Sequence, residues 1–324
     1  MKFVIYGPDY EATSRLLDDI KDTTDVFYYD NPLKIENKFL RKVAVTNMSR
    51  FTWFPFLWVW KYFVAYGDIK KNEDVIFVYW TTWFLRLSKC GFIKYIKRKY
   101  PKTQHIVRYT DVHAARKYYT EELREYIDEA YIFDKVEAEK LNMKYYRLNC
   151  SKHNIDVKEN ISYSDLFFVG QAKDRYDELI KVFEWCKRHG VSTNFHIIGV
   201  PKEKQLYVGE INYPETFIPY EETLQICMQS KCVLELQLAD VTSYSNRVYE
   251  ALIYGKRVLS NNQYLKNEEF FSDDYMCVFE DVENIDPDFV KGEPINGGRD
   301  FAYEFSPKRF LEFLEENYNA TKTN

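Results

Sequence analysis

The chain of 324 residues is 46% hydrophobic and 29% charged, which excludes a disordered protein and allows two domains of ordinary size, each with its own core. No apolar run reaches the roughly 18 residues of a membrane span, and no signal peptide precedes the first predicted strand, so we expect a cytoplasmic protein. The six cysteines form no CxxC pair, which favours reduced core residues over a disulfide framework.

The charge of the chain is unevenly distributed around its net value of −5. Residues 1–155 hold 27 Lys and Arg against 20 Asp and Glu, a net charge of +7, whereas the remainder carries 18 against 30, or −12. Residues 34–102 alone hold 15 basic and 4 acidic side chains, or +11. This asymmetry predicts two halves with different partners.

The N-terminal half reads as a doubly wound α/β domain. It opens with a strand at 2–7, a helix to about Ile20 and a strand at 26–29; further strands are predicted at 75–79, 105–109, 130–133 and 145–148. No GxGxxG follows the first strand, which argues against a dinucleotide-binding enzyme.

Two segments of this half, 38–66 and 89–102, combine aromatic rings with lysines and arginines. This mixture suits the headgroup region of an anionic membrane, so we expect peripheral membrane contact there. The alternative is that Trp53, Phe56, Trp60 and Phe63, three and four residues apart, form the core face of an ordinary helix. No motif supports nucleic-acid binding.

The strand at 105–109 leads into the titratable residues Asp111 and His113. Both are candidates for a general base, because ligand crevices in such sheets lie at the carboxyl ends of the strands. The alternative for Asp111 is a helix cap. Residues 149–164 are polar and lack periodicity, so they read as the linker between an N-terminal domain, 1–155, and a C-terminal domain, 156–324.

The second half restarts with a buried strand, 165–170, that ends in Gly170, and a loop with Lys173 and Arg175 follows. The helix after the loop, to about Arg188, carries its apolar residues at 3.6-residue spacing. A strand at 194–199 comes next, and a second helix covers about 223–229.

The apolar run 232–238 is followed by a polar loop, a helix from about Ser245 to Tyr254, and a strand at 257–260. This order is the crossover of a parallel sheet, and it brings polar side chains to the usual ligand crevice. Glu250, one turn into the helix, can accept two ribose hydroxyls, while Ser243, Ser245, Asn246 and free backbone N–H groups hold phosphate oxygens. The alternative is that Ser245 is only an N-cap and Glu250 a solvated residue.

The string Asn246–Asn262, NRVYEALIYGKRVLSNN, resembles the nucleotide-sugar motif of GT-B glycosyltransferases, and more narrowly that of bacterial enzymes that assemble capsular and lipopolysaccharide chains. The resemblance covers 165–262 best and the rest loosely. It implies an α/β fold with two Rossmann-like doubly wound domains facing a cleft, the first for the acceptor and the second for the donor. In this fold the terminal helix, here from about 307 to 318, often crosses back onto the first domain.

The resemblance also implies roles. The donor would contact Gly170, Lys173, Arg175, Ile218, Thr242, Ser243, Ser245, Asn246, Arg247 and Glu250, with the basic side chains on its diphosphate. Retaining relatives have a second Glu where this chain has Thr242, so retention and inversion both stay open; in an inverting transfer Asp111 or His113 would be the base. The implied enzyme is a metal-independent glycosyltransferase without a cofactor that extends a saccharide or lipid-linked saccharide at the inner face of a bacterial membrane. A nucleotide-sugar epimerase or hydrolase and a non-catalytic scaffold are the alternatives.

Overall fold

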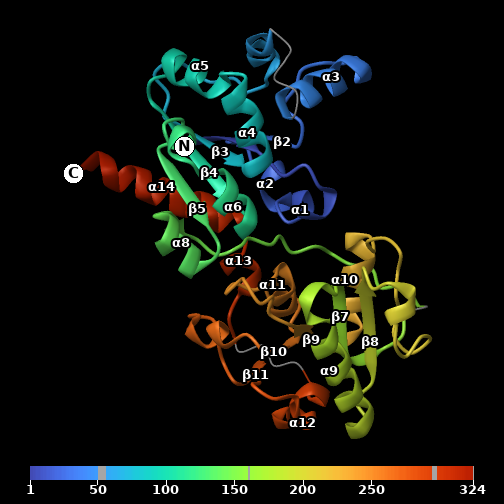
Figure 1. The fold of residues 1–324 in the computed structure, drawn as a ribbon. Helices are drawn as coiled ribbons and strands as arrows, with labels where there is room; N and C mark the ends of the chain where they lie inside the picture. Colours follow the sequence, from blue (N-terminus) through green and yellow to red (C-terminus); the bar gives the residue numbers. More distant parts are fainter. Residues whose placement is uncertain (50–55, 160, 294–297, 324) are drawn as a thin grey trace. The chain divides into compact units, whose positions relative to one another are not determined.

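The computed structural model describes residues 1–49, 56–159, 161–293 and 298–323. The described chain divides into two compact units (Figure 1). The first comprises Met1–Ser151 together with Pro307–Asn324, and the second comprises Lys152–Ser306. The chain therefore leaves the first unit once and returns to it at the terminal helix.

The first unit is built on a parallel sheet in the order β2-β1-β3-β4-β5-β6. Its strands are β1 (Lys2–Tyr6), β2 (Val26–Tyr29), β3 (Val75–Trp80), β4 (Thr103–Tyr109), β5 (Glu129–Ile132) and β6 (Lys144–Tyr145). The helices between them are α1 (Glu11–Arg15), α2 (Asp18–Lys21), α3 (Lys38–Ser49), η1 (Leu57–Phe63), α4 (Thr81–Lys89), α5 (Phe92–Lys99), α6 (Val112–Tyr118), α7 (Glu121–Arg124) and α8 (Lys135–Leu141). The predicted doubly wound domain is confirmed, although the single helix expected up to Ile20 is two short helices.

Many of the aromatic residues form a buried row across neighbouring strands of this sheet. Tyr6 of β1 stacks on Tyr79 of β3 with ring centroids 5.3 Å apart, and Phe77 stacks on His105 of β4 at 5.0 Å. The Tyr79 hydroxyl and the imidazole Nδ1 of His105 lie 2.7 Å apart, and the Tyr6 hydroxyl donates to the Ala65 carbonyl at 2.9 Å, so these buried polar atoms have partners. Flat rings fill the space between sheet and helices here, which accounts for part of the 18% of the chain that is aromatic.

The segment 56–66 does not form the amphipathic core helix that was the alternative to membrane contact. It contains the 3-10 helix η1, in which Trp60 is buried and donates its indole N–H to Asn47 Oδ1 at 2.8 Å. Phe56 and Phe63, expected on the same core face, are 55% and 39% exposed. Trp53 lies outside the described residues. In η1, therefore, Trp60 is the buried anchor, whereas Trp58, Tyr62 and Phe63 are exposed.

The terminal helix α14 (Pro307–Thr323) completes the core of the first unit. Phe310, Leu311 and Leu314 are buried against apolar residues of the sheet and of α2. At the other end of the helix, the Tyr318 hydroxyl donates to Asp74 Oδ1 at 2.9 Å. Because its apolar stripe is buried in the first unit, the helix belongs to that unit despite its place in the sequence.

The second unit repeats the architecture with a parallel sheet in the order β11-β10-β9-β7-β8. Its strands are β7 (Ser164–Gln171), β8 (Thr193–Ile198), β9 (Ser230–Glu235), β10 (Arg257–Ser260) and β11 (Met276–Val278). Its helices are η2 (Lys173–Arg175), α9 (Tyr176–His189), η3 (Lys202–Lys204), α10 (Tyr220–Met228), α11 (Asn246–Ile253), η4 (Gln263–Asn267), η5 (Val282–Asn284), α12 (Pro287–Lys291) and α13 (Phe301–Glu304). The predicted stripe of α9 is buried in the core, and Gly255 adopts φ +64° just after α11, as a helix-ending glycine does.

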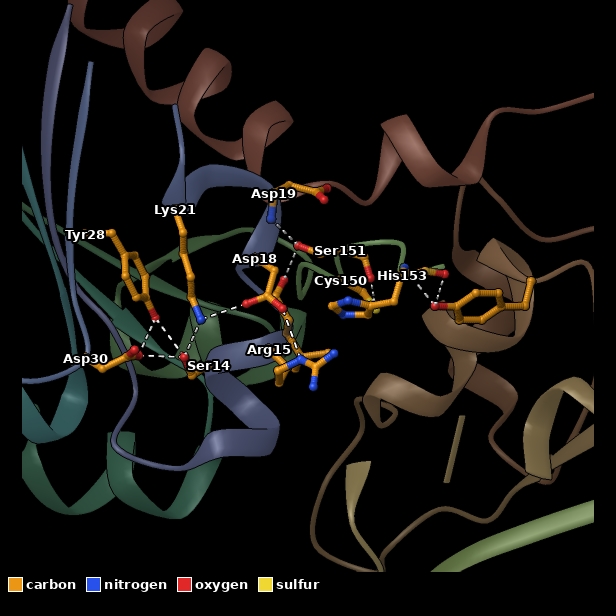
Figure 2. A network of polar contacts seen from close by, with 12 residues as sticks. Ser14, Arg15, Asp18, Asp19, Lys21, Tyr28, Asp30, Cys150, Ser151 and His153 are labelled. Atoms are coloured by element: carbon orange, nitrogen blue, oxygen red, sulfur yellow. Dashed lines mark hydrogen bonds and ion pairs between the residues drawn. The ribbon is translucent and has the colours of Figure 1, made fainter. Parts of the chain in front are cut away.

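The chain between the units is held on each side by its own unit (Figure 2). Ser151 Oγ accepts from the Asp19 backbone N–H at 3.0 Å and donates to the Leu16 carbonyl at 3.0 Å. The backbone N–H of His153 donates to the Tyr254 hydroxyl at 2.9 Å. The boundary between the two units lies at 151–152, a few residues before the expected boundary at 155–156. Much of the predicted linker therefore belongs to the second unit.

No helix in the described ranges is long and apolar enough to cross a bilayer.

Candidate functional site

The site residues predicted in the second unit gather where β7, β9 and β10 end. These strands are parallel and adjacent, so their carboxyl ends lie at one edge of the sheet. Three side chains tie the loops of this edge together. Asp174 Oδ2 accepts from the Ala239 N–H at 2.9 Å, Asn261 Oδ1 accepts from the Gln237 N–H at 2.8 Å, and Asn262 Nδ2 donates to the Thr242 and Ser243 carbonyls at 3.0 and 3.2 Å. The edge is thus a cross-linked surface.

Arg175 is used inside this edge. Its Nη1 donates to the Leu236 carbonyl at 2.5 Å, its Nη2 donates to the Gln171 carbonyl at 3.2 Å, and its guanidinium lies over the Phe168 ring. A Cβ on Gly170 would come within 3.2 Å of the Arg175 Nη2, so a glycine at this position lets the arginine pack close. Gly170 and Arg175 therefore act together as a clamp between β7 and the end of β9.

Lys173 is placed differently. It is exposed, and its backbone adopts φ +48°. Among the described residues its ammonium group has no carboxylate partner and donates no hydrogen bond. It lines a cavity of about 260 Å³ with Lys204, Tyr176 and the carboxylates Asp174 and Asp177, between the loops that follow β7 and β8. A cation beside a cavity at this edge can bind an anionic group.

Ser245 begins helix α11 and is held by a buried carboxylate. Its Oγ accepts from the Arg247 N–H at 3.2 Å, which is an N-cap. Its own N–H and Oγ donate to the two oxygens of Glu235, at 2.9 and 2.7 Å. Ser245 is therefore an N-cap, as the alternative interpretation held. Its backbone N–H, which was expected to bind a phosphate oxygen, donates to Glu235 instead.

Glu250 is buried, at 1% exposure, and forms an ion pair with Arg247, the third basic candidate. The solvated alternative for Glu250 is therefore wrong. Burial raises the pKa of this carboxyl, although Arg247 and the Tyr220 hydroxyl oppose that shift. Glu250 thus has Arg247 and the Tyr220 hydroxyl as partners, and a carboxylate with two partners still keeps lone pairs for further donors.

The other predicted residues differ in their surroundings. Asn246 is half-buried, and its Oδ1 is buried without a hydrogen-bond partner in the described part of the chain, which points to an absent donor. Thr242 and Ser243 contribute backbone carbonyls to Asn262. Ile218 is half-buried in the loop before α10, next to Phe217, which is 70% exposed.

The two residues predicted in the first unit lie at the start of α6. Asp111 Oδ1 accepts from the Ala114 N–H at 2.6 Å. Asp111 therefore caps the helix, which was the alternative to its role as a general base. Both Asp111 and His113 are exposed. A capping carboxylate still has a second oxygen, so the cap does not by itself remove Asp111 from proton transfer.

Sequence reasoning missed Glu235 and Asp9. Glu235 was hidden because it ends an apolar strand, and only the register of β9 against β10 brings it to the edge. Asp9, just after β1, pairs with Arg86 at 2.6 Å, and burial raises the pKa of its carboxyl. A strand followed by Gly-Pro-Asp was the one signal for this residue.

No group of three or more His, Cys, Asp or Glu in the described ranges is arranged to hold a metal ion. The Asp-x-Asp sequence at 286–288 has a local structural use, because Asp286 Oδ1 accepts from the Asp288 N–H at 2.9 Å and caps α12.

Two doubly wound parallel-sheet domains in one chain define the GT-B fold of glycosyltransferases, and comparison with solved structures confirms that fold class. No protein-family model matches the chain, and no curated protein matches it.

A UDP-forming α,α-trehalose-phosphate synthase from Burkholderia xenovorans matches with a TM-score of 0.54 and 10% identity, covering 98% of this chain and 99% of that one. The catalytic domain of starch synthase IV from Arabidopsis thaliana, bound to ADP and acarbose, matches with a TM-score of 0.50 and 6% identity over 78% of this chain and 74% of that one. A TarM mutant from S. aureus in complex with fondaparinux, α-GlcNAc-glycerol and UDP has a TM-score of 0.45 and 16% identity; the match covers 78% of this chain and 56% of that one. At these identities the likeness is one of fold.

Proposed function

We propose that this chain is a glycosyltransferase that moves a hexosyl group from a nucleoside-diphosphate sugar to a saccharide or lipid-linked saccharide of a bacterial surface polysaccharide. The observation that carries the proposal is the buried Glu250, one turn into α11 at the carboxyl edge of a GT-B unit. The synthase from B. xenovorans is UDP-forming and the starch synthase was solved with ADP, so the fold serves more than one base.

The donor would lie along the edge formed by β7, β9 and β10. Glu250 accepts the two ribose hydroxyls while the ion pair with Arg247 orients its carboxyl group. Lys173 binds the diphosphate, and the buried Oδ1 of Asn246 accepts a hydrogen bond from a hydroxyl group of the nucleotide sugar. Arg175, Gly170 and Ser245 hold the loops in shape without touching the diphosphate, and Ile218 and Phe217 flank the base.

In the transfer, an acceptor hydroxyl attacks the anomeric carbon, the bond from that carbon to the diphosphate oxygen breaks, and the nucleoside diphosphate leaves with the bonding electrons. In an inverting reaction Asp111 or His113 takes the hydroxyl proton. The charge on the leaving diphosphate is compensated by Lys173 and by backbone N–H groups, without a metal ion or cofactor.

The test is turnover of a panel of UDP-, GDP-, CDP-, ADP- and dTDP-sugars with and without saccharide acceptors. We expect release of one nucleoside diphosphate that depends on acceptor and is lost in Glu250→Ala. Release without acceptor would favour a hydrolase or epimerase instead. Consumption of no donor by the wild type would contradict the proposal and favour a scaffold.

We further propose peripheral contact with the inner face of a membrane through the segments 38–66 and 89–102. Phe39 of α3 is 77% exposed, and Trp58 and Tyr62 of η1 are 52% and 59% exposed. Lys61 Nζ lies 5.7 Å from the Trp58 ring and 5.0 Å from the Tyr62 ring, so exposed rings and a cation share one surface. Rings with a basic neighbour favour the interface of an anionic bilayer.

Co-sedimentation with vesicles tests this contact. We expect binding to vesicles rich in phosphatidylserine that weakens at high salt and falls several-fold in Trp58→Ser/Tyr62→Ser. Tyr303→Ser, which removes a ring of 53% exposure from the second unit, is the matched control and should bind as the wild type does. Equal loss in the control, or no binding to anionic vesicles, would contradict a membrane surface.

A further inference from the structure

A cavity of about 620 Å³ lies in the first unit, apart from the residues assigned above. One wall is a face of α4, a second is formed by the end of α6 and by α7, and a third is the end of α3. Its lining comprises Met48, Ser49, Thr82, Leu85, Arg86, Ser88, Lys89, Tyr118, Thr120, Glu122, Leu123 and Tyr126. The volume is within the range of about 300–1,000 Å³ typical of ligand sites.

Several polar groups of this cavity are not used by the fold. The side chains of Thr82 and Glu122 and the hydroxyls of Tyr118 and Tyr126 have no hydrogen-bond or ion-pair partner among the described residues. Other polar groups of the lining are satisfied: Ser88 Oγ, for example, donates to the Phe84 carbonyl at 2.6 Å. The first four groups are exposed or half-buried, so a ligand in the cavity can reach them with its own donors and acceptors.

The two cations of the cavity also differ. Arg86 is neutralised by Asp9 at 2.6 Å and donates through Nε to Ser49 Oγ at 2.9 Å. Lys89 has only a long hydrogen bond, 3.4 Å, to the Ser49 carbonyl, and no carboxylate among the described residues lies within 4.0 Å of it. A half-buried ammonium group without a counter-ion attracts an anionic group of a ligand.

We infer that this cavity binds an acidic saccharide, with its acidic group on Lys89 and its hydroxyls on Glu122, Thr82 and the two tyrosine hydroxyls. A carboxylate accepts hydroxyl donors, while the tyrosine rings and Leu85 cover the apolar face of a sugar ring. The polar groups of both signs disfavour an acyl chain, which would leave them unpaired. The inference rests on the proposed function, because it makes this saccharide the acceptor.

Saturation-transfer NMR on the full chain tests the site with methyl glucuronide, methyl galacturonide and hexose 6-phosphate, each against its neutral counterpart and inorganic phosphate. At least one acidic sugar should bind, about ten-fold more tightly than its neutral counterpart. Lys89→Gln should weaken it about ten-fold and Glu122→Gln several-fold. Lys71→Gln, an exposed lysine of the same unit outside the cavity, is the matched control.

Binding of no acidic sugar, or binding that neither variant weakens, would overturn the inference. So would phosphate binding as tightly as the sugars with no effect of Glu122→Gln, since that result describes an anion site only. Nucleotide binding in the second unit, measured on the same samples, separates the two proposals. A chain that binds nucleotide but no acidic sugar refutes this inference alone, whereas one that binds sugar but no nucleotide refutes the proposed donor site.

Discussion

Three basic side chains stand at the carboxyl edge of the second sheet, and each has a different partner. Arg175 donates to backbone carbonyls and Arg247 pairs with the buried Glu250. Lys173 has no partner in the described part of the chain and lines a cavity. Because a cation already satisfied by the fold gains little from a phosphate, we propose Lys173 as the contact for the diphosphate.

Lys173→Gln should weaken binding of a nucleoside diphosphate about ten- to a hundred-fold, because it removes a charge-assisted hydrogen bond worth about 1.5–3 kcal/mol. Binding of the nucleoside without phosphates should be unchanged. Isothermal titration with both ligands measures the difference. Lys181→Gln, an exposed lysine on α9 paired with Glu178, is the control. An equal loss for nucleoside and diphosphate would contradict a direct contact with phosphate.

At the scale of elements, helix α11 depends on a contact from the neighbouring strand. Glu235 at the end of β9 accepts both donors of Ser245, and Ser245 in turn caps the helix that carries Glu250. The start of the helix is thereby fixed to the sheet. The orientation of Glu250 then follows from the sheet register rather than from a flexible loop.

Ser245→Ala should lower the free energy of unfolding by about 1 kcal/mol, the usual cost of a lost N-cap. Glu235→Ala should cost a similar amount, about 1 kcal/mol, because it removes the acceptor of both Ser245 donors, which water can reach at this exposed residue. The double variant should cost less than the sum of the two, since the hydrogen bond from Ser245 Oγ to Glu235 is already lost in each single variant. Urea unfolding measures the cycle, and strict additivity would show that the two residues act separately.

Periodicity was sufficient to predict elements whose apolar pattern is complete. The stripe of α9 and the apolar strands β3, β9 and β10 are within a few residues of their predicted bounds. The break between α1 and α2 was not predictable, because it depends on contacts with other elements. Ser14 Oγ donates to Asp30 Oδ1 at 2.6 Å, and Leu16 and Leu17 are both buried. The same holds for η1, which the Trp60 indole fastens to Asn47 of α3.

The candidate site was also predictable only in part, because the order of the elements could be predicted but their contacts with one another could not. Sequence spacing placed Glu250 on α11 and Lys173 after β7, because both positions follow from the order of elements. It could not distinguish a side chain left for a ligand from one used by the fold, as the clamp by Arg175 and the cap by Ser245 show. Those partners are remote in sequence and are set by strand register.

At the scale of the whole molecule, the chain crosses twice between its units, at 151–152 and at 306–307. Ser151 and the backbone of His153 are each bonded within their own unit, and α14 is buried in the core of the first. The first unit, residues 1–151 with 307–324, carries 29 Lys and Arg against 23 Asp and Glu, or +6, and the second unit, residues 152–306, carries 16 against 27, or −11. This charge division fits a first unit that meets anionic partners and a second that binds nucleotide through a few placed groups.

The central claim is that the second unit binds a nucleoside diphosphate through Glu250, and a thermal-shift panel of UDP, GDP, CDP, ADP and dTDP tests it most directly. Ligand at about 100 times its Kd adds about 2.7 kcal/mol, a shift of several degrees for a domain of this size. Glu250→Ala should also lower the Tm without ligand, because Arg247 loses its partner, so each protein is compared with its own ligand-free Tm.

We expect one nucleotide to raise the Tm of the wild type and of the control Glu221→Ala, an exposed glutamate on α10, but not that of Glu250→Ala. That result would identify the base and place the ribose at Glu250. A shift of equal size in Glu250→Ala, or no shift with any nucleotide in the wild type, would contradict the account.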